Sequence, residues 1–529
     1  MAQKHTLEEL NNCSREELIT IVLMMQGQLD ALNDNIEKLI EQVRIANNYR
    51  FGRHTESLKS IEGQLSFFDE ADAAYDESSR EPSAEEVITA KRAKKKGQRN
   101  IDLKDFPEEI LPPYSVSEEQ LDAFYGKGNW RRMPDETYKR LRHEPEAWTV
   151  EIHTVEVYVG TDGDHQDEFL RGNRPKDLLR NSIVTPSLLA SILNVKYVNS
   201  SALHRIEQEF QRNGVNISRQ TMSNWIVKCS QMYFTPFVER MKLELLSLHV
   251  TQSDETPTQV IADSDHHNSK CYMWVHRSGE FYTRRPIVIY EYQKGRDHQK
   301  PLDFYKDYKG ILVTDSLQQY HLVDKKLPDV TNANCWAHAR RYFVEAIPPD
   351  LQKEDLLGSI CKEAIERINE LFAIDKGLAG LKKEEREEQR LQLEKEKLEA
   401  YFAWLQDIEP QVLPKSKLGK AVQYSLSHKE ALQAFLKSGN AALSNNICER
   451  AIRNFTIGRK NWLFSDSPKG AKASAAVYSI IETAKANGLN PFQYLKYLFE
   501  HLPNADIQRH PEHLDDLLPW NEIIQQNCK

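Results

Sequence analysis

The sequence predicts a multi-domain α+β protein. Its 529 residues exceed the roughly 250 to 300 residues at which a single hydrophobic core stops growing. Hydrophobic residues make up 40% of the chain and charged residues 28%, as in soluble globular proteins, and no run approaches the ~20 apolar residues of a membrane helix. Segments with helical periodicity lie before and after a central region of short β-like runs. These observations favour several folded domains and argue against a membrane protein.

The cysteines, the first residues and the net charge limit the class of protein further. The seven cysteines are isolated and form no CxxC pair, so neither a disulfide framework nor a zinc ribbon is expected. The start, MAQKHTLEELNN, contains acids and lacks the apolar stretch of a secretory signal. We therefore predict a bacterial cytoplasmic protein. The net charge of -9 argues mildly against a protein coated in DNA, although local basic clusters matter more for phosphate contact.

Residues 1–68 are predicted to form a helical region with a coiled coil. Ser14-Arg15-Glu16-Glu17 has the form of a helix capping box. The apolar residues that follow are spaced alternately by four and three: Leu18, Val22, Met25, Leu29, Leu32, Ile36, Leu39 and Val43. This heptad pattern favours a parallel two-stranded coiled coil and predicts a homodimer or higher oligomer through residues 14–45. The alternative is a single amphipathic helix packed on its own domain.

Two regions without assigned chemistry follow. Residues 69–100 lose periodicity and are predicted to be a flexible linker, whose basic run KRAKKKGQR either contacts DNA phosphates or is simply solvated. Residues 101–185 are predicted to be a small β-rich module, with β-like pieces such as residues 148–159.

Residues 186–240 are predicted to contain a helix-turn-helix. Residues 203–210 form the first helix of the pattern, residues 212–215 form the turn, and Ser218 is placed to cap the second helix. The second helix would present four polar side chains to a groove of double-stranded DNA: Arg219, Gln220, Ser223 and Asn224. The alternative is an ordinary helical bundle, in which two helices joined by a glycine turn are common.

Two aspartates stand on or after predicted strands of residues 241–349. A strand that starts at Leu246 runs into Asp254, and an apolar strand stops at Asp315. Between them lie β-rich runs at 271–276 and 287–292 and a helix from Pro301 to Tyr308. If the first and fourth strands are neighbours in one sheet, both carboxylates emerge side by side. Spacing alone does not exclude the other acids of this region: Asp263, Asp265, Asp303 and Asp307.

A third acid lies on a predicted helix of residues 441–490. Ser444 is placed to cap this helix, and four residues at helical spacing make a buried face: Cys448, Ala451, Ile452 and Phe455. Glu449 lies on the flank of that face and would lean over the sheet toward both aspartates. Three carboxylates suit hard divalent cations. Two such ions ~3.5 to 4 Å apart activate the nucleophile and neutralise the leaving oxygen when a phosphodiester is cut.

Each acid also has an ordinary structural explanation. Asp254 fits a solvated strand end, Asp315 fits a turn residue or helix cap, and Glu449 fits a surface ion pair with Arg453. A glycosidase is another carboxylate enzyme, and it would need two acids ~5 to 10 Å apart in a sugar cleft. It gives no reason for the arginines around Glu449.

Several strings are specific when they are read together: DETP at 254–257, CWAHARRYF at 335–343 and the long segment from NNICERAIRNF to NPFQYL at 445–495, with further segments at 51–58, 186–226 and 517–520. In these strings the chain closely resembles the insertion-sequence-66 family of transposases. The resemblance therefore covers nearly the whole chain. It implies a DDE-type enzyme with a ribonuclease-H-like catalytic core and two Mg²⁺ or Mn²⁺ ions. In that enzyme Asp254, Asp315 and Glu449 are the three catalytic acids and metal ligands.

The stretch between the second and third acids is longer than a minimal core of this fold needs. Residues 350–440 are predicted to be a helical insertion, with an exposed charged helix at 382–399, and residues 491–529 a C-terminal tail. Two features depart from the family pattern. The cysteine pairs of the family's zinc-binding module are absent from residues 101–180, so no zinc is expected. The second acid stands in Asp315-Ser316-Leu317-Gln318-Gln319-Tyr320, where the family commonly has a DGY-like string.

Basic and aromatic residues near the acids are predicted to contact DNA. Four cations cluster around the third acid, where they would hold the phosphates of the cut strand: Arg450, Arg453, Arg459 and Lys460. Arg340 and Arg341 would do the same, with Trp336 stacked on an unpaired base. The structural alternative is that Trp336 and Phe343 pack in the core. Cys335 and His338 have a metal-like spacing but no second pair, so zinc is not expected there.

We therefore predict a DNA transposase that binds the ends of its insertion sequence. It would free a 3′-hydroxyl by metal-dependent hydrolysis and direct that hydroxyl at target DNA. Companion proteins of the same element are further candidate partners. The alternative is a catalytically decayed DNA-binding accessory protein of the same element, which would bind the ends without metal-dependent nicking.

Overall fold

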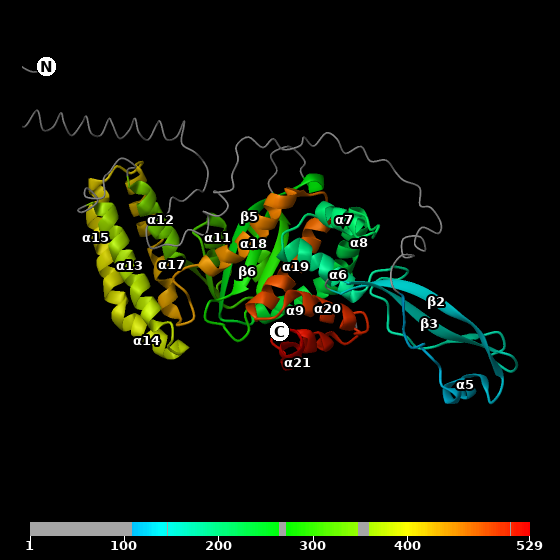
Figure 1. Cartoon of the computed structure of the whole chain (residues 1–529). Helices are drawn as coiled ribbons and strands as arrows, with labels where there is room; N and C mark the ends of the chain where they lie inside the picture. The colour runs from blue at the N-terminus through cyan, green and yellow to red at the C-terminus, as the bar shows by residue number, and fades with distance from the viewer. Residues whose placement is uncertain (1–107, 145–146, 264–270, 348–358, 508) are drawn as a thin grey trace, which may run out of the picture. The chain divides into compact units, whose positions relative to one another are not determined.

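The computed structural model describes residues 108–144, 147–263, 271–347, 359–507 and 509–529 (Figure 1). The predicted coiled coil and linker lie outside the described residues. By their contacts, residues 97–408 and 421–529 form one compact unit, and the segment 409–420 belongs to another. The elements described below belong to the first unit, apart from the turn Glu409–Gln411 and the start of α16.

A long antiparallel ribbon makes up most of the first described region. β2 (Trp130–Glu144) and β3 (Ala147–Gly160) pair along almost their whole length (Figure 1). β1 (Glu108–Ile110) runs parallel to β3, and β4 (Phe169–Arg171) runs antiparallel to it. The small helix α5 (Glu118–Tyr125) packs on the ribbon through three buried residues: Leu121, Tyr125 and Tyr158. The strand expected at residues 148–159 is therefore present within β3.

The helical region that follows contains the two helices of the predicted helix-turn-helix. Its elements are α6 (Pro186–Leu193), η2 (Asn194–Val198), α7 (Leu203–Arg212), α8 (Arg219–Cys229), η3 (Ser230–Phe234) and α9 (Thr235–Leu246). Gly214 has a positive φ of 77°, which glycine adopts without strain, in the turn between α7 and α8. The side chain of Ser218 accepts a hydrogen bond from the backbone of Thr221 at 3.2 Å and so caps α8.

A six-stranded mixed sheet is formed by strands between residues 250 and 334 together with β10. Its strands are β5 (Val250–Val260), β6 (Cys271–Ser278), β7 (Val288–Lys294), β8 (Gly310–Thr314), β9 (Val330–Asn334) and β10 (Phe464–Ser465). The main order is β7-β6-β5-β8-β9, and β10 pairs with β5. β6 is antiparallel to both β5 and β7, whereas β8 and β9 are parallel to β5. β5 therefore lies beside β8, as the sequence prediction required.

Two boundaries near the sheet differ from the prediction. Leu246 is the last residue of α9, so the first strand starts only at Val250. The alternating residues Leu246, Leu248 and Val250 belong to the end of α9, the turn after it and the start of β5, and so short a pattern does not distinguish a helix from a strand. The helix predicted from Pro301 to Tyr308 is α10 (Gln299–Tyr305), and a further helix, α11 (Gln318–Lys326), follows β8.

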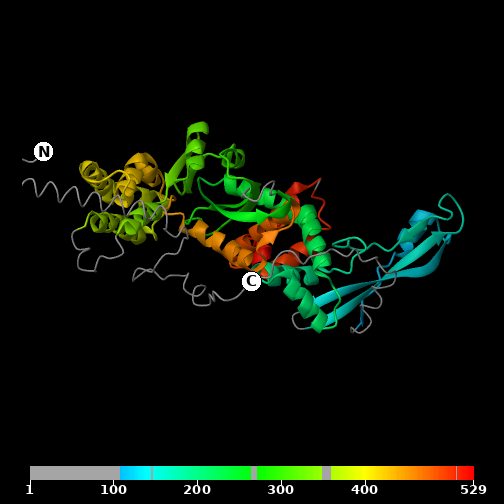
Figure 2. The same cartoon turned by 90° about the horizontal axis from the view of Figure 1, so that it is seen from above.

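Two long helices pack on the sheet. α18 (Asn446–Trp462) contacts β5 and β6, and α19 (Pro468–Ala486) contacts β7. Figures 1 and 2 show both helices in orange next to the green strands. On β7 the backbone N–H of Tyr290 donates to Ser479 at 2.8 Å, and that of Val288 donates to Thr483 at 3.0 Å. The β7 edge of the sheet is therefore covered by α19 rather than open for pairing.

The described residues between β9 and α18 are mainly helical. The helices are α12 (Trp336–Ala346), α13 (Ile360–Leu378), α14 (Lys383–Leu393), α15 (Lys395–Ile408), α16 (Lys417–Ser427) and α17 (Lys429–Gln433). The prediction of one exposed charged helix at 382–399 is wrong, because two helices meet there at Glu394. Arg386 and Arg390 of α14 are buried and donate to backbone carbonyl oxygens that include those of Gly439 and Ser438.

The chain ends in a group of shorter helices. They are α20 (Pro491–His501), η7 (Pro511–Leu517) and α21 (Glu522–Asn527), and α20 packs against α6. No helix among the described residues is long and apolar enough to span a membrane.

Candidate active site

Asp254 and Asp315 are brought together by the pairing of β5 with β8. The parallel register joins Val250 to Ile311 and ends with Gln252 beside Val313. Asp254 lies two residues after Gln252, still inside β5, and Asp315 lies two residues after Val313, directly after the end of β8. The negative charge of Asp315 raises the pKa of Asp254, which shows that the two carboxyl groups are close.

Glu449 reaches the same place from the first turn of α18. Three hydrogen bonds hold this end of the helix on the sheet. Gln252 donates to the carbonyl of Ser444 at 3.2 Å, Arg277 donates to that of Ile447 at 2.8 Å, and Tyr290 donates to that of Ala451 at 2.6 Å. The N-cap residue is Asn445 instead of the predicted Ser444. The charge of Glu449 raises the pKa values of both aspartates, so the three acids form one cluster.

The aspartates are poorly stabilised as anions in the absence of a cation. Burial, followed by the charge of Asp315, raises the pKa of Asp254 well above its ordinary value. Burial and the charge of Glu255 raise the pKa of Asp315 to about 7, even though Arg296 opposes that shift. Bound divalent cations would relieve this repulsion, and carboxylate oxygens are the ligands that Mg²⁺ and Mn²⁺ prefer. The donor set therefore fits the predicted ions.

Glu255 is a fourth carboxylate at this site, and the sequence predicts no role for it. Its side chain is 0% exposed. Oε1 accepts hydrogen bonds from Arg296 at 2.6 Å and from Gln319 at 2.8 Å, and Oε2 accepts one from Tyr320 at 2.7 Å. Both of its oxygens are thus engaged by protein donors. The sequence signal for it is the acidic pair in DETP, but its partners come from distant elements.

Two residues of α12 approach the third acid. His338 Nε2 lies 3.7 Å from one oxygen of Glu449, and Arg341 Nη2 lies 3.9 Å from the other. Burial lowers the pKa of His338 to about 4, so its imidazole is neutral at pH 7 and the contact with Glu449 is not an ion pair. Arg341 and Glu449 carry opposite charges, so their contact is an ion pair. The sequence spacing of His338 from Cys335 resembles that of metal ligands, and no local pattern indicates that His338 lies beside Glu449.

The predicted basic residues divide into exposed cations and side chains engaged with the protein. Arg450 and Lys460 are exposed, and Arg453 is half-buried. Arg459 donates to the hydroxyl of Thr256 at 3.2 Å and to the carbonyl of Pro257, so it ties α18 to the strand that carries Asp254. Arg340 donates to Asn369 at 2.7 Å.

The prediction that Trp336 stacks on a DNA base is wrong. Its side chain is 0% exposed, and its indole N–H donates to the carbonyl of Leu432 at 2.8 Å. The ring packs edge-on against Tyr401 of α15, at 5.6 Å between centroids. A base cannot reach this ring while the helical insertion is folded, so Trp336 is a core residue.

The four predicted groove-reading residues share one face of α8. Arg219, Gln220, Ser223 and Asn224 are all exposed. The opposite face is buried through Met222, Trp225, Ile226 and Cys229. This separation of polar and apolar faces leaves the polar side chains available to a partner.

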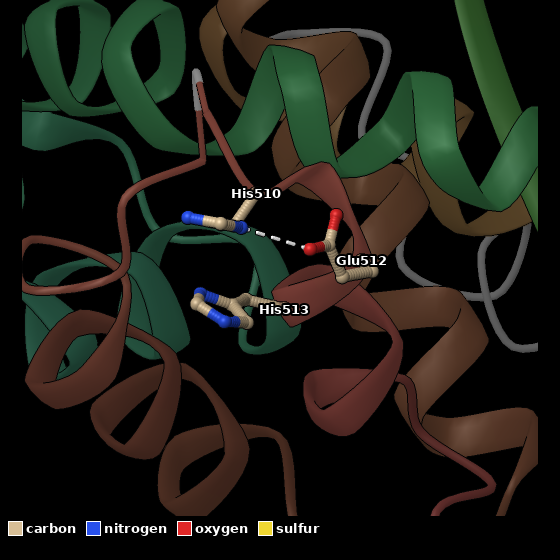
Figure 3. Close-up of side chains that lie close together, drawn as sticks. All are labelled: His510, Glu512 and His513. Atoms are coloured by element: carbon tan, nitrogen blue, oxygen red, sulfur yellow. Dashed lines mark hydrogen bonds and ion pairs between the residues drawn. The ribbon is translucent and has the colours of Figure 1, made fainter.

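A separate group of possible metal ligands lies in the C-terminal region. His510, Glu512 and His513, all exposed, place one ligand atom each within 4.8 Å of one another (Figure 3). Nδ1 of His510 is 2.9 Å from Glu512. Among the described residues, the acids Asp254, Asp315 and Glu449 do not meet this limit as a set of three. A wider spacing is expected where two ions, rather than one, share the donors.

The mixed α/β architecture, with its sheets and many helices, fits an α+β transposase. The chain belongs to the IS66 family of transposases. The description "Transposase IS66 family" matches residues 181–473, and "IS66 C-terminal element" matches residues 479–520. The resemblance noted from the sequence strings is thereby confirmed.

Three proteins of Sinorhizobium fredii are similar to the chain, and each is named as an uncharacterized protein. The protein y4qI is 29% identical over 372 residues, which are 67% of this chain and 66% of the relative. The protein y4hP is 26% identical over 505 residues, which are 93% of this chain and 88% of the relative. The protein y4jD is 26% identical over 358 residues, which are 66% of this chain and 68% of the relative.

Proposed function

We propose that this chain is a DNA transposase that cuts and joins DNA with Asp254, Asp315 and Glu449 as ligands of two Mg²⁺ or Mn²⁺ ions. It binds the ends of its insertion sequence, hydrolyses a phosphodiester bond there, and transfers the freed 3′ end to target DNA. One observation supports the proposal: three half-buried acids, from β5, the end of β8 and the start of α18, lie near enough for the charges of Asp315 and Glu449 to raise the pKa of Asp254.

We further propose that the core is ribonuclease-H-like. The order β7-β6-β5-β8-β9, with β6 antiparallel and the remaining strands parallel to β5, supports this assignment. In this arrangement the first strand is central, so an acid on it is flanked by the end of the fourth strand and is covered by the helix that carries the third acid.

The side chains have separate tasks in the proposed reaction. Divalent ions, when bound, would supply the charge that lowers the pKa of an attacking water or hydroxyl and neutralises the leaving oxygen of an in-line displacement. Asp254, Asp315 and Glu449 hold these ions through carboxylate oxygens. Arg341, with a side chain 36% exposed beside Glu449, is placed to bind a phosphate oxygen of the cut strand. The neutral imidazole of His338 adds no second positive charge at Glu449.

The test is a nicking assay with the full chain on DNA that carries the element's ends. We expect Mg²⁺-dependent nicking, and we expect its loss in Asp254→Asn, Asp315→Asn and Glu449→Gln while end binding persists. Asp307→Asn, which changes an exposed acid of the same core, is the matched control and should nick normally. End binding without metal-dependent nicking by the wild-type chain would overturn the enzyme proposal and favour the DNA-binding accessory role.

A further inference from the structure

Glu255 sits next to Asp254 in β5, but the protein uses it differently. Consecutive side chains of a strand point to opposite faces of the sheet. Asp254 accepts only the adjacent backbone N–H of Glu255, at 2.8 Å, among the hydrogen bonds resolved for it. Glu255 accepts three hydrogen bonds from side chains, and two of the donors, Gln319 and Tyr320, belong to α11. Glu255 thus connects the strand of the first acid to the helix that follows the second acid.

The connection continues from α11 to Asp315. Leu317 is the N-cap residue of α11, and its backbone N–H donates to the carboxylate of Asp315 at 3.3 Å. The backbone N–H of Tyr320 donates to the carbonyl of Leu317 at 3.0 Å. On the other side of the loop, Asn334 of β9 donates to the hydroxyl of Ser316 at 3.0 Å. The loop that bears Asp315 is therefore held both by β9 and, through Tyr320 and Glu255, by β5.

Tyr320 is suited to this task because its hydroxyl has a fixed environment. The side chain is fully buried, and the hydroxyl lies 2.7 Å from Glu255 and 3.2 Å from the hydroxyl of Ser253, also in β5. A buried carboxylate is costly unless it is paired and hydrogen-bonded. Arg296 supplies the opposite charge at 2.6 Å, and α11 supplies the other donors.

We propose that Glu255 and Tyr320 are positioning residues, which set the placement of Asp315 relative to Asp254 and thereby the affinity of the cluster for divalent ions. The proposal rests on the function proposed above. We assign no ion to Glu255 itself, because Arg296, Gln319 and Tyr320 already fill three of the roughly four acceptor positions of its carboxylate. Removing a hydrogen-bond partner behind a metal ligand typically costs 10- to 100-fold in metal affinity or activity.

The test compares Tyr320→Phe with Tyr308→Phe in the full chain. Tyr308 is also a buried tyrosine, and its hydroxyl donates to the carbonyl of Ile311 at 3.0 Å without touching an acid. Each variant is titrated with Mn²⁺ in the absence of DNA, with bound Mn²⁺ followed by electron paramagnetic resonance. Tyr320→Phe should bind Mn²⁺ about 10- to 100-fold more weakly than the wild type, and Tyr308→Phe should bind it normally. Excess Mn²⁺ should restore nicking by Tyr320→Phe.

Several results would overturn the proposal. Normal Mn²⁺ affinity in Tyr320→Phe would do so, and so would an equal loss of affinity and thermal stability in both tyrosine variants. Gln319→Ala removes the other donor from α11 at a half-buried position, so it decides the question if Tyr320→Phe does not fold. Failure of the proposed function has a different signature, because the wild-type chain itself would then bind no Mn²⁺ at the acids.

Discussion

The charge of Glu449, in the first turn of α18, raises the pKa of Asp254, in the middle of β5. The two residues are far apart in the chain, and the helical insertion lies between them. This proximity depends on α18 being held on the sheet by donors from β5, β6 and β7. The site is therefore a product of the whole core, and its properties yield the following predictions.

Divalent-ion binding should weaken as the pH falls. The raised pKa of Asp315, about 7, means that the free protein holds a proton there at pH 6, and an ion must displace it. We expect a higher dissociation constant for Mn²⁺ at pH 6 than at pH 8, with protons released on binding at pH 6. Calorimetry in two buffers of different ionisation enthalpy measures both quantities. An affinity that does not change with pH would contradict the account.

The stability of the metal-free protein should fall with rising pH because of Asp315. A carboxyl group with a raised folded pKa contributes stability that is fully present below the unfolded value of about 3.9 and is lost as the pH rises through about 7. Asp315→Asn removes this dependence. We expect the wild type to lose on the order of 1 to 3 kcal/mol relative to Asp315→Asn between pH 4 and pH 8. Urea unfolding in the presence of a chelator measures this difference, and parallel pH profiles would refute it.

Arg459 and Lys460 should behave differently when they are replaced by alanine. Arg459 donates to Thr256 and Pro257, so Arg459→Ala should cost about 1 to 3 kcal/mol of folding free energy. Lys460 is exposed, so Lys460→Ala should leave the melting temperature nearly unchanged while reducing the salt dependence of DNA binding. Thermal melting and binding at several salt concentrations measure these effects. A normal melting temperature in Arg459→Ala would show that the hydrogen bonds of Arg459 contribute little to the folding free energy.

The exposed face of α8 should determine recognition of the element's ends. Asn224→Ala should weaken binding to terminal DNA by about 1 to 3 kcal/mol and leave binding to unrelated DNA unchanged, because base contacts carry the specificity. Gln211→Ala, at an exposed position of α7, is the control. Fluorescence anisotropy with both DNAs measures the ratio of affinities. If the wild type and Asn224→Ala show the same ratio of affinities for terminal and unrelated DNA, α8 is not part of the recognition surface.

The candidate acids were accessible from the sequence because each stands in a local pattern. Asp315 follows an apolar strand, and Glu449 flanks the buried face of an amphipathic helix. Their meeting was only a conditional expectation, since periodicity does not say which strands are neighbours. The pairing of β5 with β8 supplies that information. The resemblance to a family named the same three residues through longer strings.

The errors arose where distant segments cover a side chain. Trp336 stands among basic residues in the sequence, but α15 buries it through Tyr401. Arg386 lies in a strongly charged segment, but the carbonyl of Gly439 and others accept its hydrogen bonds. Glu255 had no assigned role because its partners, Arg296 and Tyr320, come from other elements. In each case a residue distant in the sequence determines whether the side chain is buried, and the local composition does not identify that residue.

Anomalous diffraction from crystals of the full chain with terminal DNA and Mn²⁺ tests the central claim most directly. The account predicts two Mn²⁺ peaks among the carboxylates of Asp254, Asp315 and Glu449, with Glu255 bound to Tyr320 and not to an ion. Mn²⁺ found only elsewhere, for example at His510 and His513, or Glu449 turned away from both aspartates, would contradict it.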